Sequence, residues 1–168
     1  YGTYRVLSTF FEWPIWLRPA RLDDCKLLFA WANDPQVRIA SLSTKPIGWS
    51  EHQEWFNKKL ADPSSHIFIG TNTDDEPVGQ VRFDILHNRA EVSVNTAPNV
   101  RGQGIGPVLI GMGVRRLFAT TDVSDIHAII KEENTASLRA FTKAGFTPIT
   151  TYMPCPPATC RLSRHRAG

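Results

Sequence analysis

The stretch "NVRGQGIG", Asn99 to Gly106, joins a strand-like segment to a helix-like one and decides the fold. Its glycines stand at alternate positions after the basic Arg101. Residues 90–96, "AEVSVNT", alternate between apolar and polar types, and residues 107–120 form an apolar run that opens with a proline. Free backbone N–H groups at a glycine-rich turn before a helix attract anions, and the helix dipole adds to this attraction. The stretch therefore predicts an anion-binding loop; the alternative is a glycine-rich turn without a ligand.

Two other phosphate-binding loops do not fit these residues. A P-loop needs lysine and then Ser or Thr after its last glycine, whereas Pro107 and Val108 follow here. A dinucleotide-binding loop needs a third glycine three places after Gly104, where Pro107 stands. The alternating segment before the loop is also typical of an antiparallel strand. The residues expected to hold the anion are Arg101, Gly102, Gln103, Gly104, Ile105 and Gly106.

The rest of the chain predicts one α+β domain over residues 16–168, after an N-terminal extension, 1–15. Short turns between the middle strands imply an antiparallel meander, so we expect a single mixed, mostly antiparallel sheet flanked by about four helices. Strands are expected at 15–20, 66–71, 78–85, 90–96, 126–130, 146–153 and 158–163, and helices at 23–34, 50–61, 107–120 and 134–145.

Local signals refine several element boundaries. Ser50 and Gln53 have the spacing of a capping box at the start of the second helix. Asn134 is a candidate N-cap of the last helix, and Gly145 is its expected stop. Residues 35–49 show no sustained period and predict a long, partly irregular loop.

Composition excludes several classes of protein. The 168 residues carry a formal charge of +3, too mild for a nucleic-acid partner, and no groove-reading motif is present. No segment approaches the roughly 18 apolar residues of a membrane span. The odd count of three cysteines, without metal-ligand spacing, indicates no metal site and a cytoplasmic, reducing location.

Two motifs together resemble the GCN5-related N-acetyltransferase family: "VRGQGIG" and "NTASLRAFTKAGF", Asn134 to Phe146. The likeness covers about Trp16 to Tyr152. It implies an acetyltransferase fold, acetyl-CoA as co-substrate, and its pyrophosphate on the glycine loop. It also implies cofactor contacts for Val94, Asn95, Asn134 and Ser137. For two of these residues an alternative stays open: Asn134 could be only the helix N-cap, and Ser137 could be a solvent-facing serine.

Catalysis in this family implies a carboxylate on the strand before the loop. Glu91 fits, because it shares a strand face with Ser93 and Asn95; a solvated strand-end glutamate is the alternative. Val94 is expected to offer a backbone N–H to the thioester. Many members carry a tyrosine in the last helix as the acid for the leaving thiolate, but this chain has Phe141. No residue is assigned to that role.

The first half resembles acetyltransferases of nucleotide-linked amino sugars, through "WANDPQVRIAS" and "WSEHQEWF". We expect the acceptor to be the amine of such a sugar. Alternatives are a protein N-terminal or aminoglycoside-like amine acetyltransferase, or a non-catalytic CoA-binding module. Open strand edges leave room for a homodimer. The candidate acceptor contacts, each of which could instead be a core or solvent-facing residue, are Arg38, Lys45, Trp49, His52, Trp55 and Phe83.

Overall fold

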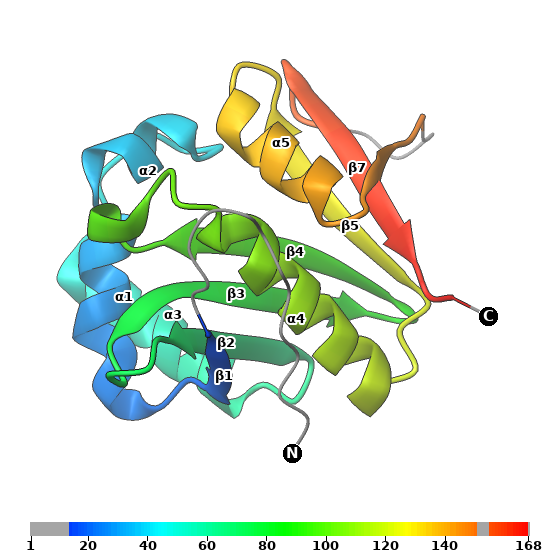
Figure 1. Ribbon diagram of the computed structural model, residues 1–168. Coiled ribbons are helices and arrows are strands. Elements are labelled where there is room, and N and C mark those ends of the chain that lie inside the picture. Colours follow the sequence, from blue (N-terminus) through cyan, green and yellow to red (C-terminus); the bar gives the residue numbers. More distant parts are fainter. Residues whose placement is uncertain (1–13, 151–154, 168) are drawn as a thin grey trace.

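The computed structural model describes residues 14–150 and 155–167, which form a seven-stranded sheet in the order β1-β2-β3-β4-β5-β7-β6 (Figure 1). Among the strand pairs of these described residues, only β4–β5 is parallel. This confirms the mixed, mostly antiparallel sheet. The strands are β1 Trp16–Pro19, β2 Ser65–Thr71, β3 Pro77–Leu86, β4 Arg89–Thr96, β5 Asp125–Lys131, β6 Thr147–Pro148 and β7 Thr159–His165.

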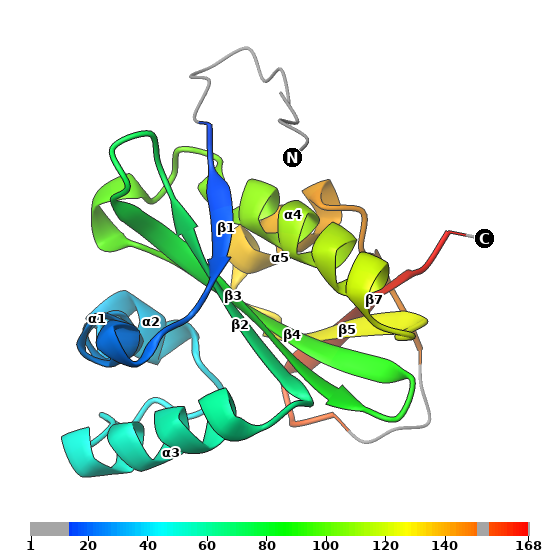
Figure 2. The same ribbon diagram turned by 90° about the horizontal axis from the view of Figure 1, so that it is seen from below.

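Helices cover both faces of the sheet (Figure 2). Helices α1, α2 and α3 lie on one side, and α4 and α5 on the other. The described residues hold five α-helices, α1 Cys25–Ala32, α2 Pro35–Ala40, α3 Trp49–Ala61, α4 Ile105–Thr120 and α5 Thr135–Lys143, and two 3₁₀ turns, Leu22–Asp24 and Pro98–Val100.

Two local predictions on the first half of the chain were wrong. Residues 35–49 are not all loop, because α2 occupies six of them and Asp34 caps it by accepting from the Gln36 N–H at 3.1 Å. A helix this short is under two turns and shows no hydrophobic period. The Ser50–Gln53 capping box also fails, since α3 begins one residue earlier, with Gly48 at the N-cap and no side-chain cap.

The second half follows the prediction more closely. The Asn134 side chain caps α5 by accepting from the Ser137 N–H at 3.1 Å. Gly145 ends the helix with a φ of +88°, which glycine adopts without strain. Of the strand expected at 146–153, the described residues 146–150 hold only β6, and 151–153, with Tyr152, lie outside the described residues.

Two apolar clusters hold the layers together. One lies between the sheet and α4 and α5, and the other lies under α1 and α3. Helix α4 approaches the sheet so closely that a Cβ on Gly113 would stand 2.7 Å from Val81 Cγ1 and 3.0 Å from Phe83 Cε2. A larger residue there would displace either the helix or these two buried side chains, so Gly113 lets α4 pack closely against the sheet.

Candidate functional site

The sheet splits between β4 and β5. Their parallel pairing covers three positions and ends at Glu91 and His127, although β4 continues to Thr96 and β5 to Lys131. Beyond that point the strands diverge, and a cleft of about 1060 Å³ opens between residues of both. Successive strand N–H groups alternate in direction. Beyond Glu91, some N–H groups of β4 therefore face the cleft, while the others face β3.

The glycine loop forms one end of this cleft. Gly102 and Gly104 have φ of +74° and +79°, in the left-handed region that glycine favours. Gly104 is the N-cap of α4, so the N–H groups of Gly104, Ile105 and Gly106 have no intrahelical acceptor. Pro107, in the first turn, has no N–H to satisfy. The loop thus presents three adjacent donors at the positive end of a 16-residue helix, which suits an anion.

Arg101 is used to anchor this loop. Its Nη1 lies 2.9 Å from Asp34 Oδ1 and 2.9 Å from Gln36 Oε1, at the start of α2. The side chain therefore links the glycine loop to the helix opposite. Its direct contact with an anion stays a prediction, and the neighbouring Gln103 is exposed and does not line the cleft.

Helix α5 forms the facing wall. Asn134 and Ser137 both line the cleft, so the structure brings the two family-like motifs to one place. Phe141 lies one turn further on, 3% exposed, with its ring centroid 5.1 Å from that of Phe146 in an edge-to-face contact. This wall offers no proton at the position where the family often has a tyrosine.

The floor of the cleft is the polar face of β3 and β4. Glu91 is exposed and stands at the apex of the split, where pairing with β5 stops. Ser93 and Asn95 follow on the same face, and Gln80 and Arg82 of β3 are their register partners. All of these residues line the cleft, and so does Val94. The carboxylate expected as a base therefore lies where the divergent strands and the acceptor wall meet.

The acceptor wall comes from α1, α2, α3 and the segment between α2 and α3. Arg38 organises that segment: its Nε donates to the Ala32 carbonyl at 2.6 Å, and its Nη1 donates to the carbonyls of Ser43 at 3.2 Å and Lys45 at 3.0 Å. Its Nη2 donates to Ser41 Oγ at 3.0 Å. Most of its donors are thus already used inside the wall, and the Lys45 side chain is exposed outside the cleft lining.

His52 is a packed histidine at the base of this wall. It is 2% exposed, its Nε2 lies 3.0 Å from the Cys25 carbonyl, and its ring contacts Phe29, Trp55 and Phe56. Burial lowers the pKa of His52, although the hydrogen bond to Cys25 opposes the shift. The neutral ring is favoured, with Nε2 donating. His52 thus fits the alternative of a core histidine; it also lines the cleft, and its contact with the acceptor stays a prediction.

Phe83 does not reach the cleft. It is 0% exposed, points to the α4 side of β3 and packs edge-to-face with Phe68. The prediction that it contacts the acceptor is corrected for this reason: its strand neighbours Gln80 and Arg82 face the cleft, and residues at odd and even positions of a strand face opposite sides.

A buried polar pair beside Glu91 was missed by sequence analysis. His127, on β5, is 4% exposed and its Nδ1 accepts from Arg161 Nη1 at 3.2 Å. Burial, with the charges of Arg89 and Arg161, lowers the pKa of His127. The segment "IHAII" looks apolar, and nothing local to it indicates a partner 34 residues away. The lowered pKa favours a neutral His127 ring, and the positive charge of the pair belongs to Arg161.

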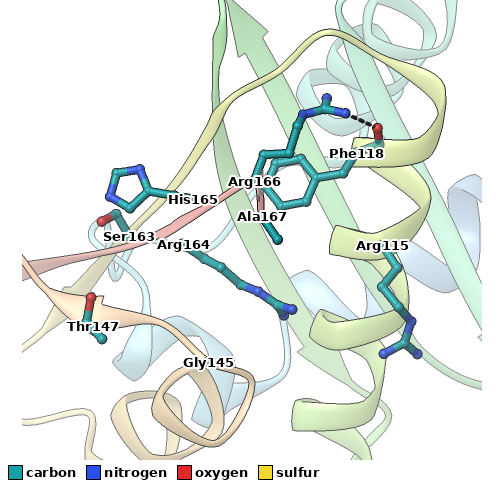
Figure 3. Close-up of a pocket in the computed structure, with 9 residues that line it drawn as sticks. All are labelled: Arg115, Phe118, Gly145, Thr147, Ser163, Arg164, His165, Arg166 and Ala167. Atoms are coloured by element: carbon teal, nitrogen blue, oxygen red, sulfur yellow. Dashed lines mark hydrogen bonds between the residues drawn. The ribbon is translucent and has the colours of Figure 1, made fainter.

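A second pocket, of about 510 Å³, lies near the C-terminal end of α4 (Figure 3). Two of its arginines serve the fold. Arg166 donates to the carbonyls of Phe118, Thr121 and Val123 and so ends α4, and Arg164 donates to the Ala144 carbonyl at 2.7 Å at the end of α5. We assign this pocket no part in the chemistry.

Residues 14–150 and 155–167 hold no group of three or more His, Cys, Asp or Glu side chains placed to bind a metal ion. Within the same ranges, every helix is too short or too polar to cross a membrane.

Comparison with known proteins agrees with this geometry. The model of a family described as "Acetyltransferase (GNAT) domain" matches residues 15–147. Spermidine N(1)-acetyltransferase of Escherichia coli K12 is 22% identical over 134 residues, which are 78% of this chain and 72% of that protein.

Solved structures show the same fold. A spermidine N-acetyltransferase of Vibrio cholerae, in complex with CoA and spermine, superposes with a TM-score of 0.78 at 18% identity, over 90% of this chain and 95% of that one. An aminoglycoside acetyltransferase in complex with coenzyme A and kanamycin gives 0.77 at 20% identity, again over 90% of this chain and 95% of that one.

Proposed function

The chain belongs to the acetyltransferase (GNAT) domain family, and from this premise we propose that it moves the acetyl group of acetyl-CoA to a primary amine of a small molecule. The observation that carries the proposal is the split of β4 from β5, with the glycine loop at its open end and Glu91 at its apex. The named relatives act on a polyamine or an aminoglycoside, which supports a small-molecule amine as acceptor; neither relative acts on a nucleotide-linked amino sugar, the acceptor that the sequence suggested.

The residues divide the work of the reaction. The free N–H groups at the start of α4, with Asn134 and Ser137 opposite, bind the phosphates and the pantetheine arm of acetyl-CoA. A backbone N–H from the part of β4 that does not pair with β5, with Val94 as the candidate, polarises the thioester carbonyl. One such donor typically stabilises the transition state by about 3 kcal/mol. Glu91 accepts the proton that the amine loses, directly or through a water.

The departing thiolate needs no dedicated acid here. A thiol has a pKa of about 8.5 and leaves tolerably as the thiolate. Phe141 therefore changes how the last proton is delivered without removing the activity. The cytoplasmic location, the domain limits and the homodimer expected from the sequence stay predictions.

The test is thiol release from acetyl-CoA with a panel of amines: spermidine, kanamycin, a ribosomal N-terminal peptide and a UDP-linked 4-amino sugar. Turnover on a small amine supports the proposal, and turnover on the peptide alone contradicts the acceptor class. A coenzyme A titration runs beside it. Absence of binding would remove the role given to the glycine loop, and binding without turnover would favour a non-catalytic module.

A further inference from the structure

One side chain of the cleft floor has hydrogen-bonding capacity that the reaction above does not use. Arg82 donates from its Nε to Asp84 Oδ2 at 3.0 Å, and its guanidinium lies over the Trp55 ring, 5.1 Å from the centroid. Among the described residues, none accepts a hydrogen bond from its Nη1 or Nη2. The guanidinium is thus held in one orientation by an ion pair and an aromatic face, while its two outer nitrogens remain available to the cleft it lines.

The neighbouring charges leave the positive charge of Arg82 only partly neutralised. Asp84 is shared with Lys59, whose Nζ lies 2.6 Å from Oδ1, so two cations share one carboxylate. Burial by itself would raise the pKa of Asp84, but the hydrogen bond from Lys59 and the charge of Arg82 outweigh it, and the pKa lies below its usual value. Asp84 therefore stays ionised and leaves one positive charge unbalanced beside the cleft.

A second group on the same strand face needs a donor. Gln80 is 8% exposed, and its Oε1 is buried without a hydrogen-bond partner among the described residues. An unsatisfied buried carbonyl costs roughly 1–3 kcal/mol, which a ligand N–H or O–H would recover. Gln80 lies two positions before Arg82, about 7 Å away along the strand, and both line the cleft.

The part of the cleft that would hold the acceptor has too few carboxylates to neutralise a polycation. Glu51 and Glu91 are the two acidic residues among those that line the cleft, and Arg38 and Arg82 stand on the same side. A polyamine or an aminoglycoside carries several positive charges near neutral pH, and two carboxylates offset by two guanidinium groups do not neutralise them.

We propose that the acceptor is an amine that also carries an anionic group, a carboxylate or a phosphate, with the anion on the outer nitrogens of Arg82, a donor group at Gln80 Oε1 and the reacting amine beside Glu91. The inference rests on the proposed function and narrows its substrate class. Guanidinium binds carboxylate and phosphate through the same paired hydrogen bonds, so both sources are kept in the test.

The kinetic test uses matched acceptors on the full chain. The pairs are phosphoethanolamine with ethanolamine and β-alanine with its amide, together with spermidine and kanamycin as cationic acceptors. The anionic member of a pair is expected to have a kcat/KM roughly ten- to a hundredfold higher than its neutral partner. Arg82→Gln should lower the ratio of the two kcat/KM values within each pair to about one, whatever its effect on either acceptor alone. The first pair reports a phosphate and the second a carboxylate.

The control is Arg116→Gln. Arg116 also lies over an aromatic ring, 5.0 Å from the Phe68 centroid, but on α4 and outside the cleft lining. It should change neither preference. Equal kcat/KM within both pairs, or a higher kcat/KM for spermidine or kanamycin than for the anionic amines, overturns the inference and leaves the proposed function standing.

A binding measurement keeps the inference testable if no amine of the panel reacts. Inorganic phosphate or acetate is titrated into protein saturated with coenzyme A, and the melting temperature is followed. The anion should raise the melting temperature of the wild type and of Arg116→Gln more than that of Arg82→Gln. The same rise in all three overturns the inference, and failure to bind coenzyme A at all identifies a failure of the proposed function instead.

Discussion

The two ends of the cleft are built in different ways. The cofactor end is mostly backbone: two glycines in the left-handed region, the start of α4 and the capped start of α5. The acceptor end is mostly side chains from α1, α2, α3, β3 and β4, which interlock through Arg38, Arg82 and His52. A site made of backbone is set by short local patterns, whereas a site made of side chains is set by packing between distant segments.

The largest effect should come from Glu91→Gln, at the point where the two ends meet. Loss of the carboxylate is expected to lower kcat by about 10²–10⁴-fold, because general-base catalysis is lost and the shape of the residue is kept. Coenzyme A affinity should not change, since Glu91 is remote from the glycine loop in the proposed binding mode. Steady-state kinetics and calorimetry measure the two quantities.

The matched control for that change is Glu54→Gln, an exposed glutamate on α3 outside the cleft lining. It should retain wild-type kcat. A loss of kcat in both variants, or in neither, would contradict the role of Glu91.

At the cofactor end, Gly104→Val forces a β-branched residue into a φ of +79°. Strain on the order of 1–3 kcal/mol is expected, and it would distort the donors at the start of α4. Coenzyme A affinity should fall roughly ten- to a hundredfold. Titration calorimetry checks this result.

Gly111→Ala, inside the same helix, serves as the comparison. Its new Cβ would stand 3.8 Å from Arg115 Nη1, an ordinary contact. Affinity should be unchanged and the melting temperature equal or higher, because alanine favours the helix interior. An equal loss of affinity in both variants would mean that α4 itself, and not the loop, was disturbed.

At the acceptor end, Arg38→Ala removes four hydrogen bonds that hold residues 41–45 against the end of α1. The KM for the amine should rise about tenfold. Coenzyme A affinity should change much less than this, and the melting temperature should change little. Independence of the two ends predicts this split.

Lys45→Ala separates the loop's backbone from its side chain. Only the Lys45 carbonyl is used in the wall, so this variant should behave as wild type. A raised KM in Lys45→Ala would restore the direct role in acceptor binding that the sequence suggested.

The smallest effect concerns pH and stability. Burial lowers the pKa of both His52 and His127 below the usual histidine value of about 6.5. The unfolded chain therefore binds more protons than the folded one as the pH falls below about 6.5. Stability should be constant between about pH 7.5 and 8.5 and should fall below 6.5, by at most about 1.4 kcal/mol per pH unit for each histidine.

Urea unfolding at a series of pH values measures this slope. The His52→Gln variant should reduce this slope by up to the contribution of one proton, about 1.4 kcal/mol per pH unit. An unchanged slope in the variant would mean that His52 titrates normally in the folded protein.

The same contrast explains what the sequence predicted. The glycine loop, the Asn134 cap and the Gly145 stop are contiguous signals, and the structure places them as expected. The start of α3 was misplaced because its N-cap is Gly48, which has no side chain to signal a cap, whereas Ser50 has the side chain and spacing typical of one. Phe83 was misplaced because aromatic character does not reveal a strand face. The Arg82–Asp84–Lys59 group joins α3 to β3, and no local pattern indicates that contact.

The short parallel pairing of β4 with β5 has a consequence for the unliganded protein. On the side that faces the cleft, backbone groups of β4 beyond Glu91 and of β5 beyond His127 lack a neighbouring strand, so the part of the sheet formed by β5, β7 and β6 is held mainly by the shared apolar cluster under α4 and α5. A ligand seated in the split supplies the missing neighbour and binds only the folded state, which raises stability in proportion to the logarithm of its concentration above Kd. Amide hydrogen exchange along Val92–Thr96 and Ala128–Lys131 should therefore slow more than in any other strand when coenzyme A is added.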